Sequence, residues 1–258
     1  MSVSTPPPSR ATREGRPVPP RRPLRERARL ATPRELDAIP WLPSLTPSER
    51  EQIVARLQVA EVEAGEHICR VGRAASHWFG VIDGLLKLSE AQASARTSGF
   101  NGVASGGWWG ESTLLRRETY RHDIQALRHS VVAGLPLEAF EDLLATSIAF
   151  NRYLLRQLNE RMEQLLAARE MERRNDPDLR VARHLAALFH PQLCPGVAGL
   201  LRITQQELGL LVGLSRQRVN EALGRLEADR LIAVAYGGVR VLELERLRQY
   251  PDVLPPSG

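Results

Sequence analysis

The chain has 258 residues, of which 43% are hydrophobic, and its formal net charge is +5. This length is sufficient for two domains that each bury a core of their own. No apolar run reaches the roughly 18 residues of a membrane span and no secretory signal opens the sequence, so we expect a cytoplasmic protein without a membrane partner. The two cysteines, Cys69 and Cys194, lack metal-ligand spacing and are too few for an iron–sulfur cluster, so no metal site is expected.

The positive charge is concentrated at the N-terminus. Residues 1–35 hold nine arginines and eight prolines against three glutamates, a net of +6, so the rest of the chain is close to neutral. Such a segment buries too little apolar surface to fold, which predicts a disordered tail over residues 1–35. A basic arm that attracts phosphate is one interpretation, but an extension without a function is the interpretation that we favour. A short flexible tail is expected at residues 251–258.

Residues 36–136 have the texture of a β domain. Short β-prone runs, such as residues 78–82 and 85–88, alternate with glycines through most of this region. Many short strands separated by turn residues predict a β-sandwich or jelly roll, here called the β-roll.

A long helix is predicted next. Residues 137–173 contain neither glycine nor proline, and an apolar seam repeats in them at alternating steps of four and three residues. The seam consists of Leu144, Ile148, Asn151, Leu155, Leu158, Met162 and Leu165. This heptad pattern predicts a helix over residues 137–175 that pairs with the same helix of a second subunit, with Asn151 fixing the register. The alternative is a helix that packs its stripe against its own β-roll, as the wider apolar stripe near its start indicates.

Residues 176–250 predict a winged helix-turn-helix. The Asn-Asp-Pro sequence at residues 175–177 breaks the long helix and forms a hinge, after which Asp178 is expected to cap a new helix. Two further helix starts then follow at Thr204 and Ser215, with Gly213 in the turn between them. Two β-prone runs flanking a Gly-Gly pair at residues 237–238 predict a β-hairpin, the wing.

The second of these paired helices carries a polar face that suits the major groove of DNA. Its side chains can donate hydrogen bonds to base edges and phosphates or accept them, and the arginine of the wing is placed to contact the DNA backbone. The expected DNA-binding residues are Thr204, Ser215, Arg216, Gln217, Arg218, Asn220, Glu221 and Arg240. A solvated polar face on an ordinary helical hairpin is the alternative.

The order β-roll, long helix and winged helix-turn-helix gives an α+β protein that resembles the Crp/Fnr family of bacterial transcription regulators. Its motifs are the residue 203–227 helix-turn-helix, Gly-Leu-Leu-Lys-Leu at 84–88, and the Gly-rich stretch 106–115 followed by residues 120–123. We refer to the last motif as the cassette. The resemblance implies a homodimer that binds a double-stranded DNA operator and contacts RNA polymerase, and it implies no enzymatic activity.

The cassette resembles the family's phosphate-binding motif for cyclic nucleotides. The resemblance implies effector contacts by Gly110, Glu111, Ser112, Arg121 and His122. His122 replaces the small hydroxyl residue that follows the arginine in nucleotide-binding members, so a cyclic AMP-like effector is open and no cofactor is certain. Haem is not expected, because His67, Cys69 and His77 are more typical of structural positions.

Two other classes of function remain open at this point. One is an enzyme that uses Glu111, Arg121, His122 and Asp123 as an acid/base cluster. The sequence offers no nucleophile–base motif to support this function. The other is a cyclic-nucleotide-binding regulatory module that acts on a partner protein rather than on DNA.

Overall fold

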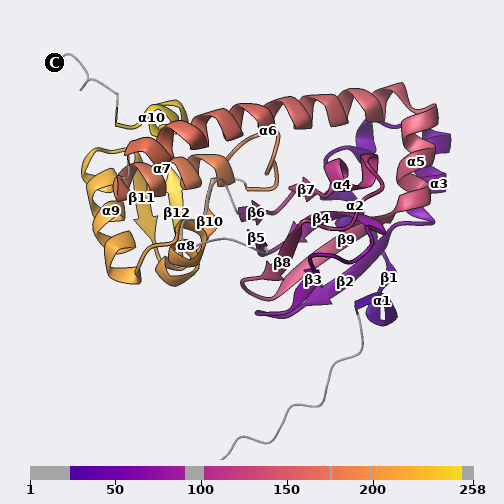
Figure 1. Cartoon of the computed structure of the whole chain (residues 1–258), viewed down its shortest axis with the longest axis horizontal. Helices are drawn as coiled ribbons and strands as arrows, with labels where there is room; N and C mark the ends of the chain where they lie inside the picture. Colours follow the sequence, from indigo (N-terminus) through magenta and orange to yellow (C-terminus); the bar gives the residue numbers. More distant parts are fainter. Residues whose placement is uncertain (1–23, 91–101, 175, 198, 252–258) are drawn as a thin grey trace, which may run out of the picture.

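The computed structural model describes residues 24–90, 102–174, 176–197 and 199–251 (Figure 1). Two antiparallel sheets form the β-roll, one with the strand order β1-β2-β9-β4-β7 and the other with the order β3-β8-β5-β6. The strands are β1 (Arg29–Leu30), β2 (Gln58–Val62), β3 (His67–Cys69), β4 (His77–Asp83), β5 (Leu85–Glu90), β6 (Gly102–Ala104), β7 (Trp108–Trp109), β8 (His122–Ala126) and β9 (Ser130–Pro136). The predicted α+β class with a β-roll is confirmed.

An aromatic cluster holds the first sheet to the helices that cover it. Trp78 of β4 lies with its ring centroid 4.5 Å from that of Trp108 and 5.5 Å from that of Trp41, and all three indoles are buried. Phe140 and Phe150 extend the same cluster into the helices after β9. Large aromatic side chains contribute much of the apolar area that stabilises a core, so this cluster anchors the helices that follow β9 to the first sheet.

The helices around the roll are short. Thr46 accepts a hydrogen bond from the backbone of Glu49, and the Glu49 carboxylate accepts one from the Thr46 backbone, which closes a capping box. The helices that precede or interrupt the strands are α1 (Leu24–Arg27), α2 (Pro33–Asp37), the 3-10 helix η1 (Leu42–Ser44), α3 (Pro47–Val54) and α4 (Glu111–Leu115).

The prediction that residues 1–35 form a disordered tail is wrong for the last third, residues 24–35. Strand β1 pairs with β2, and Arg29 forms two hydrogen bonds of 2.8 and 2.6 Å with the carboxylate of Glu35. This arginine and the Thr32 backbone hold the pKa of Glu35 down at about 2. Composition over a window misses such a segment, because a two-residue strand is ordered by the sheet edge it joins rather than by its own apolar content. Residues 1–23 lie outside the described residues.

The predicted single helix over residues 137–175 is two helices, α5 (Leu137–Thr146) and α6 (Ile148–Arg174). Ser147 lies between them in an extended conformation, and its hydroxyl accepts a hydrogen bond from the Phe150 backbone. The side-chain amide of Asn151 donates to the Leu144 carbonyl at 2.8 Å. Serine therefore acts as an N-cap inside a sequence that has no glycine or proline, a role that the heptad pattern does not reveal.

The second domain contains α7 (Pro177–Leu188), β10 (Leu201–Arg202), α8 (Gln205–Val212), α9 (Arg216–Ala228), β11 (Ile232–Ala235), β12 (Gly238–Val241) and α10 (Leu244–Gln249). Asp176, not the predicted Asp178, caps α7, since its carboxylate accepts hydrogen bonds from the backbone of Asp178 and Leu179. Pro177 at the first helical position explains the shift, because proline is favoured there and has no N–H to satisfy.

The two domains pack against each other beneath α6, which runs along both of them (Figure 1). Leu85 and Ala104 of the roll belong to the same buried cluster as the apolar residues of α7, α8 and α9. The Gly196 backbone donates to the Ser105 carbonyl at 3.0 Å, and Arg128 forms a 2.8 Å ion pair with Glu207 of α8. The C-terminal domain is thus joined to the roll by an apolar contact and by polar contacts at its rim.

Candidate DNA-binding and effector sites

Local hydrogen bonds set the angle between α8 and α9. Thr204 and Glu207 close a capping box at the start of α8, and Gly213 ends this helix in the left-handed conformation with φ +67°. Ser215 caps α9 by accepting a hydrogen bond from the Arg218 backbone at 3.2 Å. These three predicted helix signals are confirmed. Thr204 was also expected to contact DNA, and in this structure its hydroxyl contacts the Glu207 carboxylate at 2.8 Å.

Gly209 is a residue that the sequence reasoning missed. A Cβ atom there would lie 2.7 Å from the Leu214 carbonyl oxygen and 3.8 Å from Val219. Only glycine allows α8 to approach the turn and α9 this closely. An isolated glycine inside a helical pattern was the available signal.

The outer face of α9 is polar and exposed. Arg216, Gln217, Asn220 and Glu221 all lie in solvent, while Val219 and Leu223 on the opposite side are buried. The amide of Gln217 donates to Glu221 at 3.3 Å. Gln205 of α8 donates to the Asn220 side chain at 2.7 Å, so the two helices also share a surface hydrogen bond.

Two arginines of α9 face α7 instead. Arg225 forms a 2.6 Å ion pair with Asp178, and Arg218 reaches Asp178 at 3.3 Å and Glu221 at 2.8 Å. The hydrogen bond from Arg218 holds the pKa of the Glu221 carboxyl below its usual value, so this group is ionised. Arg218, one of the expected DNA contacts, links α9 to the first turn of α7.

The wing consists of β11 and β12, joined by Tyr236 and Gly237, and β10 adds a third strand that the sequence did not reveal. Gly237 has φ +73°, which the tight turn requires. The Tyr236 side chain is fully exposed at the tip, and Arg240 is exposed on β12.

In the cassette, Glu111 faces the inside of the protein. Gly110 adopts φ +107° and starts α4, which places Glu111 in a buried position with 2% of its surface exposed. The carboxylate accepts a hydrogen bond from the Trp78 indole at 3.2 Å and forms a 3.2 Å ion pair with Arg161 of α6. Arg161 also donates to the Trp108 carbonyl, as does the nearby Gln157 at 3.2 Å.

The other cassette residues have separate partners. Arg121 is exposed and pairs with Glu118 at 2.8 Å, and Ser112 is exposed on α4. His122 packs edge-to-face on Trp109 with a centroid distance of 6.0 Å. The Glu111 carboxylate and the Arg121 guanidinium are therefore not brought together, and Arg121 would have to leave Glu118 to hold a phosphate beside Glu111.

The predicted acid/base cluster is likewise divided. The Asp123 carboxylate accepts a hydrogen bond from the Val71 backbone at 2.7 Å, which is a loop-fixing contact. Between the sheets, Trp109 stacks on Tyr120 with ring centroids 6.4 Å apart, and both belong to a buried apolar cluster. Side chains thus fill much of the space between the two sheets.

The heptad seam, which starts at Leu144 of α5 and continues along α6, is split between covered and exposed positions. Ile148, Leu155, Met162 and Leu165 remain 69, 66, 57 and 62% exposed, while Leu144, Asn151 and Leu158 are half-buried. Leu166 adds to the exposed group. Within the described residues, no helix is long and apolar enough to cross a membrane, and no three His, Cys, Asp or Glu side chains are grouped so as to hold a metal ion.

A β-roll connected by a long helix to a winged helix-turn-helix defines a two-domain, DNA-binding regulator. Comparison with known proteins supports this class. Residues 59–147 match the cyclic nucleotide-binding domain family, and residues 179–250 match the Crp-like helix-turn-helix domain family. The chain belongs to the Crp/Fnr family of transcriptional regulators.

Two curated relatives agree with this assignment. The HTH-type transcriptional regulator Cmr of Mycobacterium tuberculosis is 26% identical over 78% of this chain and 81% of its own length. The transcriptional regulator LdrP of Thermus thermophilus is 25% identical over 69% of this chain and 89% of its own.

Solved structures show the same fold. FixK2 of Bradyrhizobium japonicum matches with a TM-score of 0.58 at 16% identity, over 77% of this chain and 98% of its own. The global regulator CLP of Xanthomonas campestris, described as responsive to c-di-GMP, matches with a TM-score of 0.52 at 24% identity, over 76% of this chain and 99% of its own.

Proposed function

We propose that this regulator acts as a homodimer in which two α6 helices pair and two α9 helices read a two-fold DNA operator. The observation that carries the proposal is the exposed apolar row on α6. Four large apolar side chains of one heptad seam, from Ile148 to Leu165, lie in solvent on a helix whose other face is covered. A contiguous apolar surface of this kind is typical of an interface, and a two-fold axis lets one surface cover its own copy.

On DNA, the exposed face of α9 supplies the side chains for the major groove. Gln217 presents an amide suited to adenine, and Glu221 presents an acceptor for the cytosine amino group. Arg216 at the start of α9 and Arg240 of the wing supply positive charge for the phosphates. Ser215 and Thr204 contribute by fixing the helix starts, and Asn220 by its hydrogen bond to α8. From family membership alone we infer that the protein also contacts RNA polymerase.

For the cassette, we favour a structural role over binding of a cyclic nucleotide. Glu111 is engaged by Arg161 and Trp78, so the roll and α6 are already joined through the carboxylate that a ribose would need. The second candidate, a cyclic AMP-like effector, is supported by the matching domain family and by the intact Gly110-Glu111 pair. Isothermal titration of the full chain with cyclic AMP, cyclic GMP and c-di-GMP distinguishes the two, since saturable binding of any of them favours the effector.

The proposal is tested by selecting DNA sites from a random pool with the purified protein and measuring its mass in solution by light scattering. We expect a dimer and an enriched site with two-fold symmetry. A monomer, or a pool in which no site binds more tightly than random DNA at the same salt concentration, contradicts the proposal. If the protein is instead a module that regulates a partner protein, Arg216→Ala should leave the regulation of that partner unchanged.

A further inference from the structure

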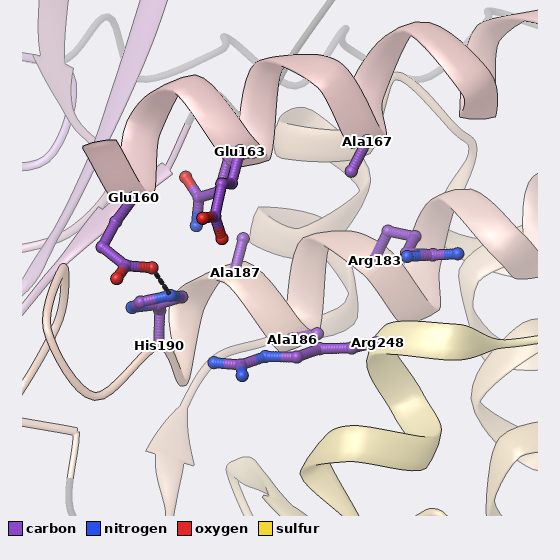
Figure 2. Close-up of a pocket in the computed structure, with 9 residues that line it drawn as sticks. Glu160, Glu163, Ala167, Arg183, Ala186, Ala187, His190 and Arg248 are labelled. Carbon is purple, nitrogen blue, oxygen red and sulfur yellow. Dashed lines mark ion pairs between the residues drawn. The ribbon is translucent and has the colours of Figure 1, made fainter. Parts of the chain in front are cut away.

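A charged cleft lies between α6 and the DNA-binding domain, apart from both the cassette and α9. It has a volume of about 220 Å³ and is lined by Glu160, Glu163, Gln164 and Ala167 of α6, Arg183, Ala186 and Ala187 of α7, His190, and Arg248 of α10 (Figure 2). A cleft of this size can hold several water molecules or one small organic molecule.

The two walls of the cleft carry opposite charges. The α6 wall contributes the carboxylates Glu160 and Glu163, and the opposite wall contributes the guanidinium groups of Arg183 and Arg248 (Figure 2). His190 spans the cleft at one end, with its Nε2 atom 3.1 Å from the Glu160 carboxylate. A ligand in the middle of the cleft would therefore meet negative charge on one side and positive charge on the other.

His190 is held neutral. Its Nδ1 atom accepts hydrogen bonds from the backbone of Gln192 and Leu193 at 3.2 and 3.3 Å, which leaves the proton on Nε2 facing Glu160. Burial and the nearby Arg248 lower the pKa of His190, while Glu160 and Glu163 act against this shift. Because His190 is neutral, the charged groups that line the cleft are the carboxylates of Glu160 and Glu163 and the guanidinium groups of Arg183 and Arg248.

Arg248, which lines this cleft, has one donor without an acceptor. Its Nη1 atom contacts Glu245 at 2.7 Å, but its Nη2 atom is buried and has no hydrogen-bond partner within the part of the chain that the structure describes. A buried guanidinium nitrogen without an acceptor is costly, and a carboxylate is the group that satisfies it best. Glu163, across the cleft, is exposed, and its carboxylate accepts a long 3.3 Å hydrogen bond from Asn159.

We propose that this cleft binds a small zwitterion of the α-amino acid type. Its carboxylate binds Arg248 and its ammonium group binds Glu163 and Glu160. A simple anion would be repelled by the two glutamates and a simple cation by the two arginines, whereas a zwitterion complements both walls. The methyl groups of Ala167, Ala186 and Ala187 provide an apolar surface for a short aliphatic side chain.

Such a ligand would connect α6 to α10 and thereby restrain the DNA-binding domain relative to the long helix. Binding to this cleft does not depend on the proposed dimer or operator. Only its consequence for DNA affinity depends on them, so failure to bind and failure to recognise DNA are separate results.

The probe is L-leucine, titrated into the full chain by calorimetry at millimolar concentrations, well below those at which amino acids stabilise proteins by exclusion from their surface. Two comparison compounds each lack one charge: 4-methylpentanoate has no ammonium group and 3-methylbutylamine has no carboxylate. We expect saturable binding of leucine and binding at least roughly tenfold weaker for both comparison compounds, as is usual when a charge-assisted contact is lost.

Glu163→Gln and Arg248→Gln are each expected to weaken leucine binding by roughly tenfold or more. Glu51→Gln on α3 and Arg246→Gln on α10 are matched controls outside the cleft that should leave it unchanged. Because Glu163 is exposed, its variant is expected to fold even if the Arg248 variant does not. The absence of saturable leucine binding, equal binding of either comparison compound, or leucine binding that survives Glu163→Gln overturns the proposal.

Discussion

The buried carboxylate of Glu111 and the guanidinium of Arg161 form an ion pair of 3.2 Å across the joint between the β-roll and α6. The glutamate comes from the cassette and the arginine from the helix that carries the proposed dimer surface. The residue expected to hold a ribose therefore connects the roll to the helix that would transmit a signal.

Removing the arginine should destabilise the protein. Arg161→Ala leaves Glu111 buried with only the Trp78 indole as a partner, and we expect a loss of about 2–4 kcal/mol, below the usual value for fully buried pairs because Arg161 is 26% exposed. Urea unfolding measures the change in the free energy of unfolding. Arg152→Ala, an exposed arginine on the same helix, is the control, and equal stability of the two variants would contradict a structural role for the pair.

The dimer interface can be tested with one charge. Leu155→Glu places a carboxylate in the middle of the exposed row on α6, where it would be buried without a partner in the dimer. We expect light scattering to report half the wild-type mass. Leu115→Glu alters an equally apolar, 45% exposed residue on α4 and should leave the dimer intact. Dissociation by both variants, or by neither, would show that the row on α6 is not the interface.

Gln217 should determine sequence preference. Gln217→Ala removes an exposed amide of α9 without changing charge, and we expect the affinity for the selected operator to fall by about 1–3 kcal/mol. The affinity for random DNA should be unchanged, since nonspecific binding depends on phosphate contacts. Fluorescence anisotropy with both DNAs at one salt concentration measures the ratio, and an equal loss on both would argue against base recognition by this side chain.

Loss of Arg240 in the wing, unlike loss of Gln217, should weaken DNA binding whatever the DNA sequence. Arg240→Ala is expected to weaken binding to all DNA sequences and to lower the slope of log affinity against log salt by about 1, as for the loss of one phosphate contact. Arg50→Ala, an exposed arginine of α3 far from the wing in the fold, serves as the control. A changed operator preference with an unchanged salt slope would assign the wing a base-reading role instead.

Stability should depend on pH through His190. Its folded-state pKa lies below the ordinary value of 6.5 because of burial and Arg248, so the neutral ring contributes stability above pH 6.5. This contribution is lost as the pH falls through the folded-state pKa, where the ring must take a proton at Nδ1 and lose the two backbone hydrogen bonds there.

The free energy of unfolding, measured by urea between pH 8 and pH 5, checks this dependence. His190→Gln should be less stable than the wild type by about 1–2 kcal/mol at pH 8, because an amide oxygen replaces the ring poorly as an acceptor. The difference between the two proteins should shrink as the medium becomes acidic. A difference that is constant with pH would mean that His190 does not titrate in this range.

The sequence by itself determined the helix boundaries of the helix-turn-helix and the shared helix faces, because these depend on residues within a few positions of one another. The helix-turn-helix follows from Thr204, Gly213 and Ser215, because a cap or a left-handed glycine acts within one helical turn. The heptad seam likewise contained four of the exposed apolar side chains of α6, Ile148, Leu155, Met162 and Leu165, since helical periodicity decides which side chains share a face.

Only the tertiary structure decided the roles that depend on distant partners. No sequence pattern reveals that Glu111 pairs with Arg161, fifty positions further along the chain, or that Arg218 is held by Asp178. Ser147 separates α5 from α6, and Phe140 and Phe150 on either side of it are buried in one cluster. The cleft of Arg248 exists only where three helices meet. Charges and polar groups find partners after packing, so burial and the direction of each side chain become defined in the folded chain.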